Sequence, residues 1–543
     1  MNRPQVVGQP TTSQHFKTGI NQIADLLAPT LGPTGGHVAS QRDSGMKVEL
    51  LDDAATIVRR ILSIGQPQDD IGAMVMRNLI WRVSQRAGDG GATAAVLARE
   101  FFNQGMKLVA AGVNSVRLER GVEQGIKIAI QALKDQAHSV HTEDELSAVA
   151  KTITKEGDLS LVLGEMSYLL GSDPRVIVEK YVAPYLEREY INGAHYKAKI
   201  SSMYFYTDAQ RKRAVITDLA VALVNERLER QEQVVPLLEG AIAQGKKGLL
   251  LIVKDVVNDA LGLLVSNHQL DKEKKKLDIL SVKLSEIGDE MRWGWMDLAT
   301  LTGATILGPE YDRTGAQAVT SDLGEAQRAE YASEGIVLVA PRESRNAIQQ
   351  EVANLRTLVE ETPLDDEERP KYVKRLSTLT GGIGRLKIGA SSKLHREMLY
   401  QHSQRAFNVL SAAQRGGIVP GGGAGLMYCV PALEAAVRAN GASEEILMGI
   451  RLVSDVLSAP MRQIVKNAGI HEPAVIVDRV LTAGTPATYN ALTGEVGNAF
   501  DLGVLDVVDV LATSLSTAAS GAMMALSTDA IVYHKKPEQS LQP

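Results

Sequence analysis

The chain has 543 residues, of which 44% are hydrophobic and 22% are charged, as in an ordinary globular protein with about three or four domains of roughly 150 residues. The formal net charge of −6 argues against a nucleic-acid or anionic membrane surface, and a single cysteine, Cys429, excludes an internal disulfide framework. The N-terminal sequence does not resemble a secretory signal, and no apolar run is long enough for a confident membrane span. We therefore expect a cytoplasmic protein with neither nucleic acid nor membrane as a partner.

Helical periodicity dominates the N-terminal part of the chain. Apolar residues recur there at the spacing of one helix face, and Pro29 marks the end of the first such segment. The segments predicted to be helical are 13–29, 69–87, 92–112 and 116–136. After Gly381 the chain is predicted to be helical again, apart from loops at 416–423 and 485–506.

The middle of the chain has a different pattern. Short continuous apolar runs at 176–178 and 248–253 are typical of buried strands, and helical segments lie between and after them. These helical segments are 232–244, 257–266 and 346–361. Strand–helix alternation of this kind predicts an α/β domain from about 193 to 380, inserted into a helical outer part.

Three glycine-bearing segments, well separated in the sequence, are candidates for one nucleotide site: 30–36, 88–93 and 421–423. Glycine allows backbone N–H groups to approach phosphate oxygens without an intervening side chain. Asp52 and Asp89 could supply the hard oxygen ligands that Mg²⁺ prefers beside those phosphates. Each segment alone is typical of a plain structural turn, so only their combination favours a nucleotide.

A series of short sequences in a fixed order resembles a known family. The sequences are APTLGP at 28–33, GDG at 88–90, DLATLTG at 297–303, two glycines at 381–382, APMRQIV at 459–465, YNA at 489–491 and GNAFDLGVLD at 497–506. With them, the chain resembles a group I chaperonin of the GroEL type over essentially its full length. The resemblance implies a mixed α and α/β fold with the three-domain chaperonin architecture.

The three domains implied by this resemblance are built from separate parts of the chain. A helical equatorial domain, which binds nucleotide and forms the ring, would comprise 1–135 and 416–543. A small hinge-like intermediate domain would comprise 136–192 and 381–415, and an α/β apical domain that binds client proteins would comprise 193–380.

The resemblance also implies a site for ATP and Mg²⁺, and most of its positions are filled as in the family. The implied nucleotide contacts are Thr30, Leu31, Gly32, Pro33, Asp89, Gly90, Gly91, Ala92, Thr93, Gly422, Ile464, Tyr489, Asn490, Ala491 and Asp506. Asp89 is the implied metal ligand, and Asp52 matches a carboxylate near the γ-phosphate and is the candidate catalytic residue. A carboxylate such as Asp506 can accept hydrogen bonds from ribose hydroxyls.

Two departures from the family pattern concern the phosphates. The family has three threonines after its Gly-Asp-Gly, whereas this chain has Gly91, Ala92 and Thr93. Each lost hydroxyl removes a hydrogen bond worth on the order of 1 kcal/mol, so two could weaken binding roughly ten- to a hundredfold. Thr34 and Leu51 also stand where the family has basic residues, which indicates a less cationic phosphate environment.

A third departure concerns hydrolysis. Sixteen positions before Gly421, where the family has its hydrolytic aspartate, this chain has Arg405. A guanidinium stays protonated and cannot act as a base. The only acidic residue from 391 to 416 is Glu397, which lies about 80° around a helix and roughly 12 Å along it from Arg405. We expect severely reduced ATP turnover, and whether the chain is an enzyme stays open. Arg405 could instead clamp a γ-phosphate or be an ordinary surface residue.

The family's apolar client-binding groove matches a set of mostly apolar positions in the middle of the chain. They are Ile200, Tyr204, Phe205, Val235, Leu238, Leu261 and Val265. Val235 and Leu238 are three residues apart and are expected to share one exposed helix face. The alternative is that these residues belong to the core of the α/β domain.

We interpret the chain as a chaperonin-type protein that captures unfolded proteins and assists their folding, with ATP bound in the equatorial domain and its hydrolysis in doubt. The alternative is an ATPase-deficient paralogue that acts as a passive holdase or as a structural subunit of mixed chaperonin rings. The expected partners are unfolded clients and further copies in a homo-oligomeric ring. A GroES-type co-chaperonin is a candidate partner.

Overall fold

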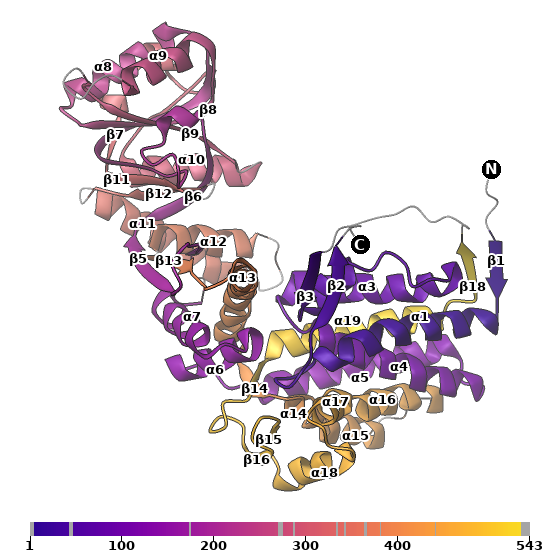
Figure 1. Cartoon of the computed structure of the whole chain (residues 1–543). Coiled ribbons are helices and arrows are strands. Elements are labelled where there is room, and N and C mark those ends of the chain that lie inside the picture. The colour runs from indigo at the N-terminus through magenta and orange to yellow at the C-terminus, as the bar shows by residue number, and fades with distance from the viewer. Residues whose placement is uncertain are drawn as a thin grey trace. The chain divides into compact units, whose positions relative to one another are not determined.

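The computed structural model describes residues 5–42, 47–172, 175–269, 275–285, 288–332, 335–341, 344–362, 366, 368–380, 382–439, 441 and 443–533. Gly381, one of the two glycines in the family pattern, lies outside these residues. The chain forms two compact units (Figure 1). One, the helical unit, contains residues 1–172 and 397–543, and the other, the α/β unit, contains residues 173–396.

The helical unit contains both ends of the chain. Its first segment consists of β1 (Gln5–Gly8), α1 (Thr11–Leu27), β2 (Val38–Arg42), β3 (Lys47–Leu51), α2 (Ala54–Arg59), α3 (Pro67–Ala87), α4 (Gly91–Ala110), α5 (Ser115–Asp135), α6 (Glu143–Thr154) and α7 (Gly157–Leu170). The second segment consists of most of α13 (Lys393–Gly416), then β14 (Ile418–Pro420), α14 (Ala424–Met427), α15 (Val430–Ala439), α16 (Glu444–Val456), α17 (Ala459–Asn467), α18 (Pro473–Ala483), β15 (Ala487–Asn490), β16 (Glu495–Asn498), β17 (Leu505–Val507), α19 (Val508–Leu526) and β18 (Ala530–Tyr533).

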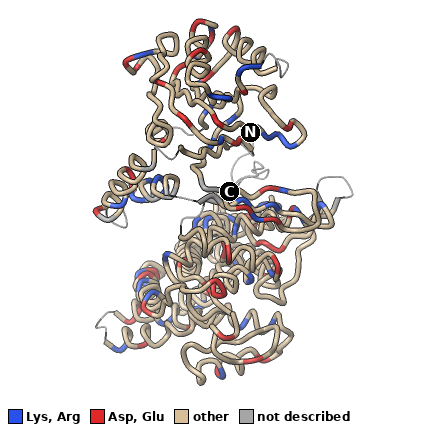
Figure 2. Tube along the Cα trace, turned by 90° about the vertical axis from the view of Figure 1, so that its left-hand side faces the viewer, with Lys and Arg blue, Asp and Glu red and all other residues tan. Residues whose placement is uncertain are grey.

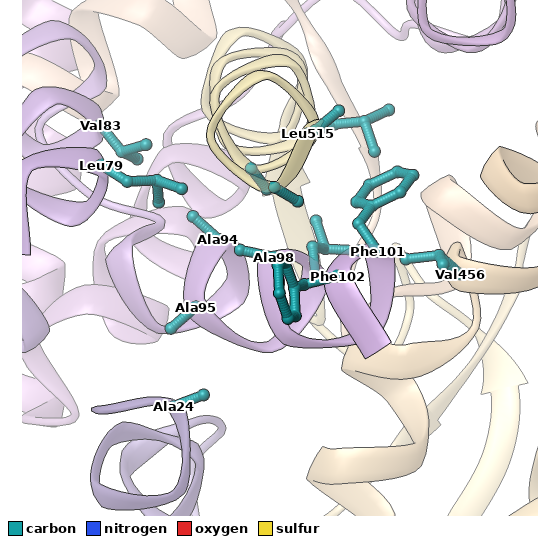
Figure 3. Packing of buried hydrophobic residues seen from close by; sticks show 14 of the residues in the cluster. Ala24, Leu79, Val83, Ala94, Ala95, Ala98, Phe101, Phe102, Val456 and Leu515 are labelled. Atoms are coloured by element: carbon teal, nitrogen blue, oxygen red, sulfur yellow. The ribbon is translucent and has the colours of Figure 1, made fainter. Parts of the chain in front are cut away.

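Helix α4 lies at the centre of the core of the helical unit, packed against α1, α3 and α19 (Figure 3). Its small residues, such as Ala94 and Ala98, let neighbouring helices approach, while the buried Phe101 and Phe102 fill the volume between them. Where α1 crosses α3, a Cβ on Gly19 would lie 2.2 Å from the carbonyl oxygen of Asp69, so only glycine fits. This packing fixes the start of α4, which is one side of the candidate site.

In its described residues, the α/β unit contains two separate sheets. Its elements are β4 (Arg175–Lys180), β5 (Glu187–Asn192), β6 (Ala194–Ile200), β7 (Ala214–Leu228), α8 (Val235–Ala243), β8 (Gly248–Val256), α9 (Asn258–His268), β9 (Asp278–Leu284), α10 (Asp289–Thr302), β10 (Ile306–Leu307), β11 (Gly324–Ala332), β12 (Gly335–Val339), α11 (Arg345–Glu361), α12 (Arg369–Thr380) and β13 (Gly382–Ile388). Within the described residues, the larger sheet has the strand order β10-β7-β11-β12-β6-β9-β8, and β8 also pairs with β7. The six strands from β7 to β8 therefore form a closed circuit.

The predicted helix after Gly381 is wrong over residues 382–388. This segment forms β13, which pairs in parallel with β4 and antiparallel with β5. Its sequence has glycines at 382 and 384, which weaken a helix, and it buries Leu386 and Ile388 on one face. Helical structure then resumes with α13, as predicted.

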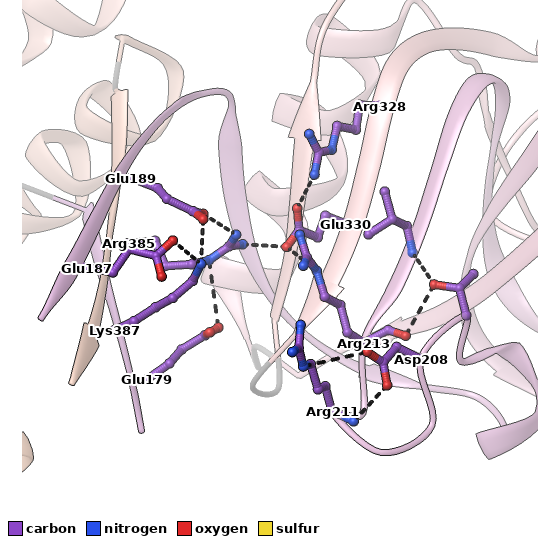
Figure 4. A network of polar contacts seen from close by, with 12 residues as sticks. Glu179, Glu187, Glu189, Asp208, Arg211, Arg213, Arg328, Glu330, Arg385 and Lys387 are labelled. Atoms are coloured by element: carbon purple, nitrogen blue, oxygen red, sulfur yellow. Dashed lines mark hydrogen bonds and ion pairs between the residues drawn. The ribbon is translucent and has the colours of Figure 1, made fainter. Parts of the chain in front are cut away.

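Charged residues of both signs are interspersed along the traces of the two units (Figure 2). A cluster of charged side chains in the α/β unit joins the small sheet to the large one (Figure 4). Arg385 of β13 contacts Glu330 of β11 at 2.7 Å, and Arg213 contacts the same carboxylate at 2.9 Å. Burial alone would raise the pKa of Glu330, but the hydrogen bond from Arg213 and the charges of Arg385, Arg213 and Arg328 lower it below its usual value.

We predict that Glu330→Gln strongly destabilises the α/β unit, because Arg385 is buried and would lose a charged partner. The expected loss is about 3–5 kcal/mol of unfolding free energy, measured from urea transitions followed by tryptophan fluorescence. The pKa of Glu330 is lowered in the folded state, so its contribution is present above its unfolded pKa and is lost as the pH falls through the folded pKa. Arg211→Ala, which removes an exposed ion pair with Asp208, is the control and should change stability by less than about 1 kcal/mol. Equal effects of the two variants would contradict the role of the buried cluster.

Candidate functional site

A cavity of about 350 Å³ lies within the helical unit, and it brings together segments from both ends of the chain. The residues expected to contact nucleotide that line it are Thr30, Leu31, Gly32, Pro33, Asp89, Gly90, Ala92, Thr93, Gly422, Ile464, Tyr489, Asn490, Ala491 and Asp506. Asp52 and Arg405 also line it. Gly91 does not: it is buried at the start of α4, where an added Cβ would lie 3.0 Å from the Ala54 side chain.

The loop between α3 and α4 forms one wall of the cavity. Gly88 and Gly90 have φ values of 78° and 91°, which side chains with a Cβ rarely adopt, and these two turns place Asp89 between the helices. A Cβ on Gly90 would also lie 2.3 Å from the Ser514 hydroxyl. The N-terminus of α4 therefore opens toward the cavity, and the free N–H groups and positive dipole end of a helix N-terminus favour an anion such as phosphate.

The first loop is held in place by α17. The side-chain amide of Asn467 donates to the carbonyl oxygens of Ala28 and Leu31, both at 2.8 Å. Gly32 has a φ of 88°, and a Cβ there would lie 3.2 Å from the Ile464 side chain. Through this contact Ile464 lies beside the loop at 30–33, and both line the same cavity. Asn467 is a positioning residue that the sequence analysis did not identify.

The glycines at 421–423 lie beside β17, which carries Asp506. The Thr488 hydroxyl donates to the Gly421 carbonyl at 2.7 Å and fixes the start of this loop. Burial raises the pKa of Asp506 to about 6, with a further contribution from the charge of Asp89, although N–H groups of Gly423 and Gly422 donate to the carboxylate. Asp506 therefore binds a proton at a higher pH than an ordinary carboxyl group, and its ionised form can accept hydrogen bonds from hydroxyl groups.

Asp89 is the best candidate metal ligand in the cavity. Burial raises its pKa, and the charge of Arg405 and the Gly90 N–H offset this only in part. A buried carboxylate of this kind is stabilised in its ionised form by a bound cation. In the described part of the chain, no group of three or more His, Cys, Asp or Glu residues could hold a metal alone. The site fits Mg²⁺, which commonly uses one or two carboxylates together with phosphate oxygens.

Two carboxylates at the start of α2 contact two side chains of α13. His402 and Arg405 are three residues apart and face this turn. The Nε2 atom of His402 lies 3.2 Å from the nearer oxygen of Asp52, and Nη1 of Arg405 donates to Oδ1 of Asp53 at 2.6 Å. Asp53 also caps α2, since its Oδ2 accepts from the Thr56 N–H at 2.9 Å.

These contacts make Asp52 a weak base. Burial alone would raise its pKa, but the hydrogen bond and charge of His402, with the charges of Arg405 and Lys155, lower it to about 2. A carboxylate with this pKa can orient a water molecule but accepts a proton poorly near neutral pH. Arg405 therefore holds a second carboxylate, Asp53, beside the candidate catalytic residue.

The sequence analysis missed two further cations in the cavity wall, Lys151 and Lys155 of the α6 segment. Together with Arg405, they place positive charge in the cavity wall. Thr34 and Leu51, which are expected at positions where the family has basic residues, carry no charge. Lysines four apart at the end of a helix share a face, but nothing in the sequence shows that this face lies opposite the loop at 30–33. Only the packing of α6 and α13 against the nucleotide loops brings these lysines to the cavity.

The apolar positions of the α/β unit divide into two groups. The side chains of Tyr204 and Val235 are exposed, and those of Ile200, Leu261 and Val265 are half-buried against the core. The expectation that Phe205 and Leu238 lie on an exposed groove is wrong. Phe205 is fully buried with its ring 5.6 Å from that of His268, and Leu238 is 9% exposed because it faces the sheet below α8.

A family model, described as the TCP-1/cpn60 chaperonin family, matches residues 23–168 and 185–536. The chain belongs to this family. It is also similar to crystal structures of the chaperonin gp146 from the bacteriophage EL 2 of Pseudomonas aeruginosa, in the presence of ATP-BeFx. Crystal forms I and II give TM-scores of 0.74 and 0.70 at 18% identity, each covering 98% of this chain and 99% of the other. The structure therefore has the chaperonin fold, as predicted. In the described residues, no helix has the length and apolar character required to cross a membrane.

We predict that binding of Mg²⁺–ATP weakens as the pH falls through about 6. Asp506 has a raised pKa of about 6 and Asp89 is also raised, so both bind protons at a higher pH than ordinary carboxylates and then no longer accept from ribose or hold the metal. Titration with a fluorescent ATP analogue between pH 5 and pH 8 measures this. Asp506→Asn is the control and should remove the contribution near pH 6. Affinity that is constant down to pH 5 would contradict the assignment.

Proposed function

We propose that this chain is a subunit of a group I, GroEL-type chaperonin that captures unfolded proteins and assists their folding. The observation that carries the proposal is one cavity in a chain of the chaperonin family, lined by residues 30–33, by Asp89, Gly90, Ala92 and Thr93, and by residues between 422 and 506. In the proposed assembly, copies of the chain form a homo-oligomeric ring in the cytoplasm. The helical unit would contribute the equatorial domain (1–135 and 416–543), and the apical domain (193–380) would belong to the α/β unit. The hinge-like intermediate domain would comprise 136–192 and 381–415.

ATP and Mg²⁺ are the proposed ligands of the cavity. Asp89 would hold Mg²⁺, and the N–H groups at the start of α4 would donate to phosphate oxygens. Asp506 would accept from the ribose, and Ile464 and the YNA segment at 489–491 would enclose the rest of the nucleoside. Bound Mg²⁺ would neutralise phosphate charge and polarise the terminal phosphate. Ala92 provides no hydroxyl at this wall, whereas Thr93 does.

Hydrolysis is proposed to be severely reduced. Arg405 cannot accept a proton, and Asp52 is held near pKa 2 by His402 and the cations around it. Asp52 would then orient the attacking water without activating it strongly. The alternative function follows directly: a passive holdase, or a structural subunit of mixed rings in which an ATPase-competent chaperonin supplies the missing aspartate.

We predict that restoring a carboxylate on α13 increases ATP turnover only when Asp53 is neutralised as well. Arg405→Asp alone places a third carboxylate beside Asp52 and Asp53 and leaves Asp53 without its cation. Asp53→Asn keeps a good helix cap for α2, so the double variant should release phosphate on the order of a hundredfold faster than the unmodified protein. Steady-state phosphate release by purified, size-checked assemblies measures this, with Asp53→Asn alone as the control. Clear turnover by the unmodified protein would contradict the proposed loss of hydrolysis.

Client proteins would bind to the α/β unit at its exposed apolar side chains. Tyr204 is 57% exposed and Val235 is 37% exposed, and the partly exposed Leu261 and Val265 lie on the neighbouring α9. A contiguous exposed apolar surface, unlike a single exposed side chain, is unusual on a protein with no partner, and we propose that these side chains form one. The same surface is where a GroES-type co-chaperonin would dock.

We predict that Tyr204→Ser combined with Val235→Ser weakens suppression of aggregation of a denatured client protein, while the protein itself stays folded. The loss follows from the removal of apolar area available to an unfolded chain. Light scattering of a diluted, denatured client measures it. Tyr168→Ser, at an exposed tyrosine of α7 in the helical unit, is the matched control and should have no effect. Unchanged suppression by the double variant would rule out this surface.

A further inference from the structure

We propose that Lys155 and Arg405 together bind the terminal phosphate of ATP and make the cavity selective for ATP over ADP. The inference rests on the proposed nucleotide site and deepens it. It assigns a specificity role to one residue that matches no family motif and to one that replaces a catalytic carboxylate.

Lys155 has an unusual backbone and an unpaired charge. It follows α6 with a φ of 57°, and its N–H donates to the Lys151 carbonyl at 3.0 Å. Glycine or asparagine is normally found at this left-handed position, where a longer side chain is unfavourable. The Lys155 side chain lines the cavity, and no described residue forms a hydrogen bond or ion pair with its ammonium group. A strained lysine with a free charge in a cavity fits an anionic ligand.

Arg405 approaches the same place from α13. Its Nη1 donates to Asp53, and no described residue accepts from its other donors. A guanidinium has five N–H donors, so Arg405 can keep Asp53 and bind a phosphate oxygen at the same time. The side chain is mostly buried, which strengthens a charged hydrogen bond relative to one in open solvent.

The two cations act at one end of the cavity. Arg405 donates to Asp53, the neighbour of Asp52, and both cations line the cavity. Their charges lower the pKa of Asp52 and Asp89, whereas the pKa of Asp506 is set by burial, the charge of Asp89 and the N–H groups of Gly422 and Gly423. Asp506 marks the proposed ribose end and Asp89 the proposed metal end. Lys155 and Arg405 therefore lie where the outermost phosphate of a triphosphate would reach. A diphosphate in the same pose has no group there, so loss of either cation should affect ATP more than ADP.

Lys155→Gly tests this role without disturbing the fold, because glycine is well suited to a φ of 57°. Thermal stability should be kept or increased, while ATP affinity falls on the order of tenfold and ADP affinity changes by less than about twofold. Affinities are measured in the full-length, assembled protein with Mg²⁺, by competition against a fluorescent nucleotide. Lys155→Arg keeps the charge and should retain the preference for ATP.

Lys212→Gly is the matched control. Lys212 is also a lysine with a positive φ, 49°, and it is exposed in the α/β unit and does not line the cavity. Its replacement by glycine removes one positive charge and relieves the strain of a positive φ, as in Lys155→Gly. It should leave the affinities for ATP and ADP unchanged. Equal losses of ATP and ADP affinity in Lys155→Gly, or no loss, would overturn this inference alone. Failure of the unmodified protein to bind either nucleotide would overturn the proposed nucleotide site as well.

Discussion

Four carboxylates surround one cavity of the helical unit, and the site depends on compensation of their negative charges. Asp52, Asp53, Asp89 and Asp506 all line it, and like charges this close together disfavour one another's ionisation. His402 and Arg405 compensate the pair at the start of α2, and backbone N–H groups support Asp506. Burial keeps the pKa of Asp89 raised, so an added cation would stabilise its ionised form. Two side chains of α13 take part in this balance, and the proposed affinity for Mg²⁺–ATP follows from it.

Arg405 stands where we expect the family's hydrolytic aspartate, and in this structure it has a structural role. A cation at 405 binds Asp53, which is also the cap of α2, and so connects α13 to the turn that carries Asp52. A guanidinium at this position provides no proton acceptor. We infer that the site favours retention of nucleotide over its turnover, which suits a chaperonin that holds clients or supports an active partner subunit.

Much of the fold could be predicted from the sequence, because strong periodic patterns and glycine turns are local signals. The helices α3, α4 and α5, the strand β8 and the inserted α/β unit were predicted on that basis. The strand β13 was missed because its partners β4 and β5 lie about 200 residues earlier in the chain. Phe205 and Leu238 were misplaced because an apolar side chain next to a groove and one beneath it look alike in sequence. His402, Lys151 and Lys155 were missed because only the packing of α6 and α13 brings them to the loops.

The most direct test of the account is an experimental structure of the assembled protein with Mg²⁺ and a non-hydrolysable ATP analogue. The account predicts the analogue in the cavity of the helical unit, with the metal on Asp89, the ribose on Asp506, and Lys155 and Arg405 within about 3 Å of terminal phosphate oxygens. A cavity that stays empty at saturating ligand, or an analogue bound elsewhere on the chain, would contradict the central claim.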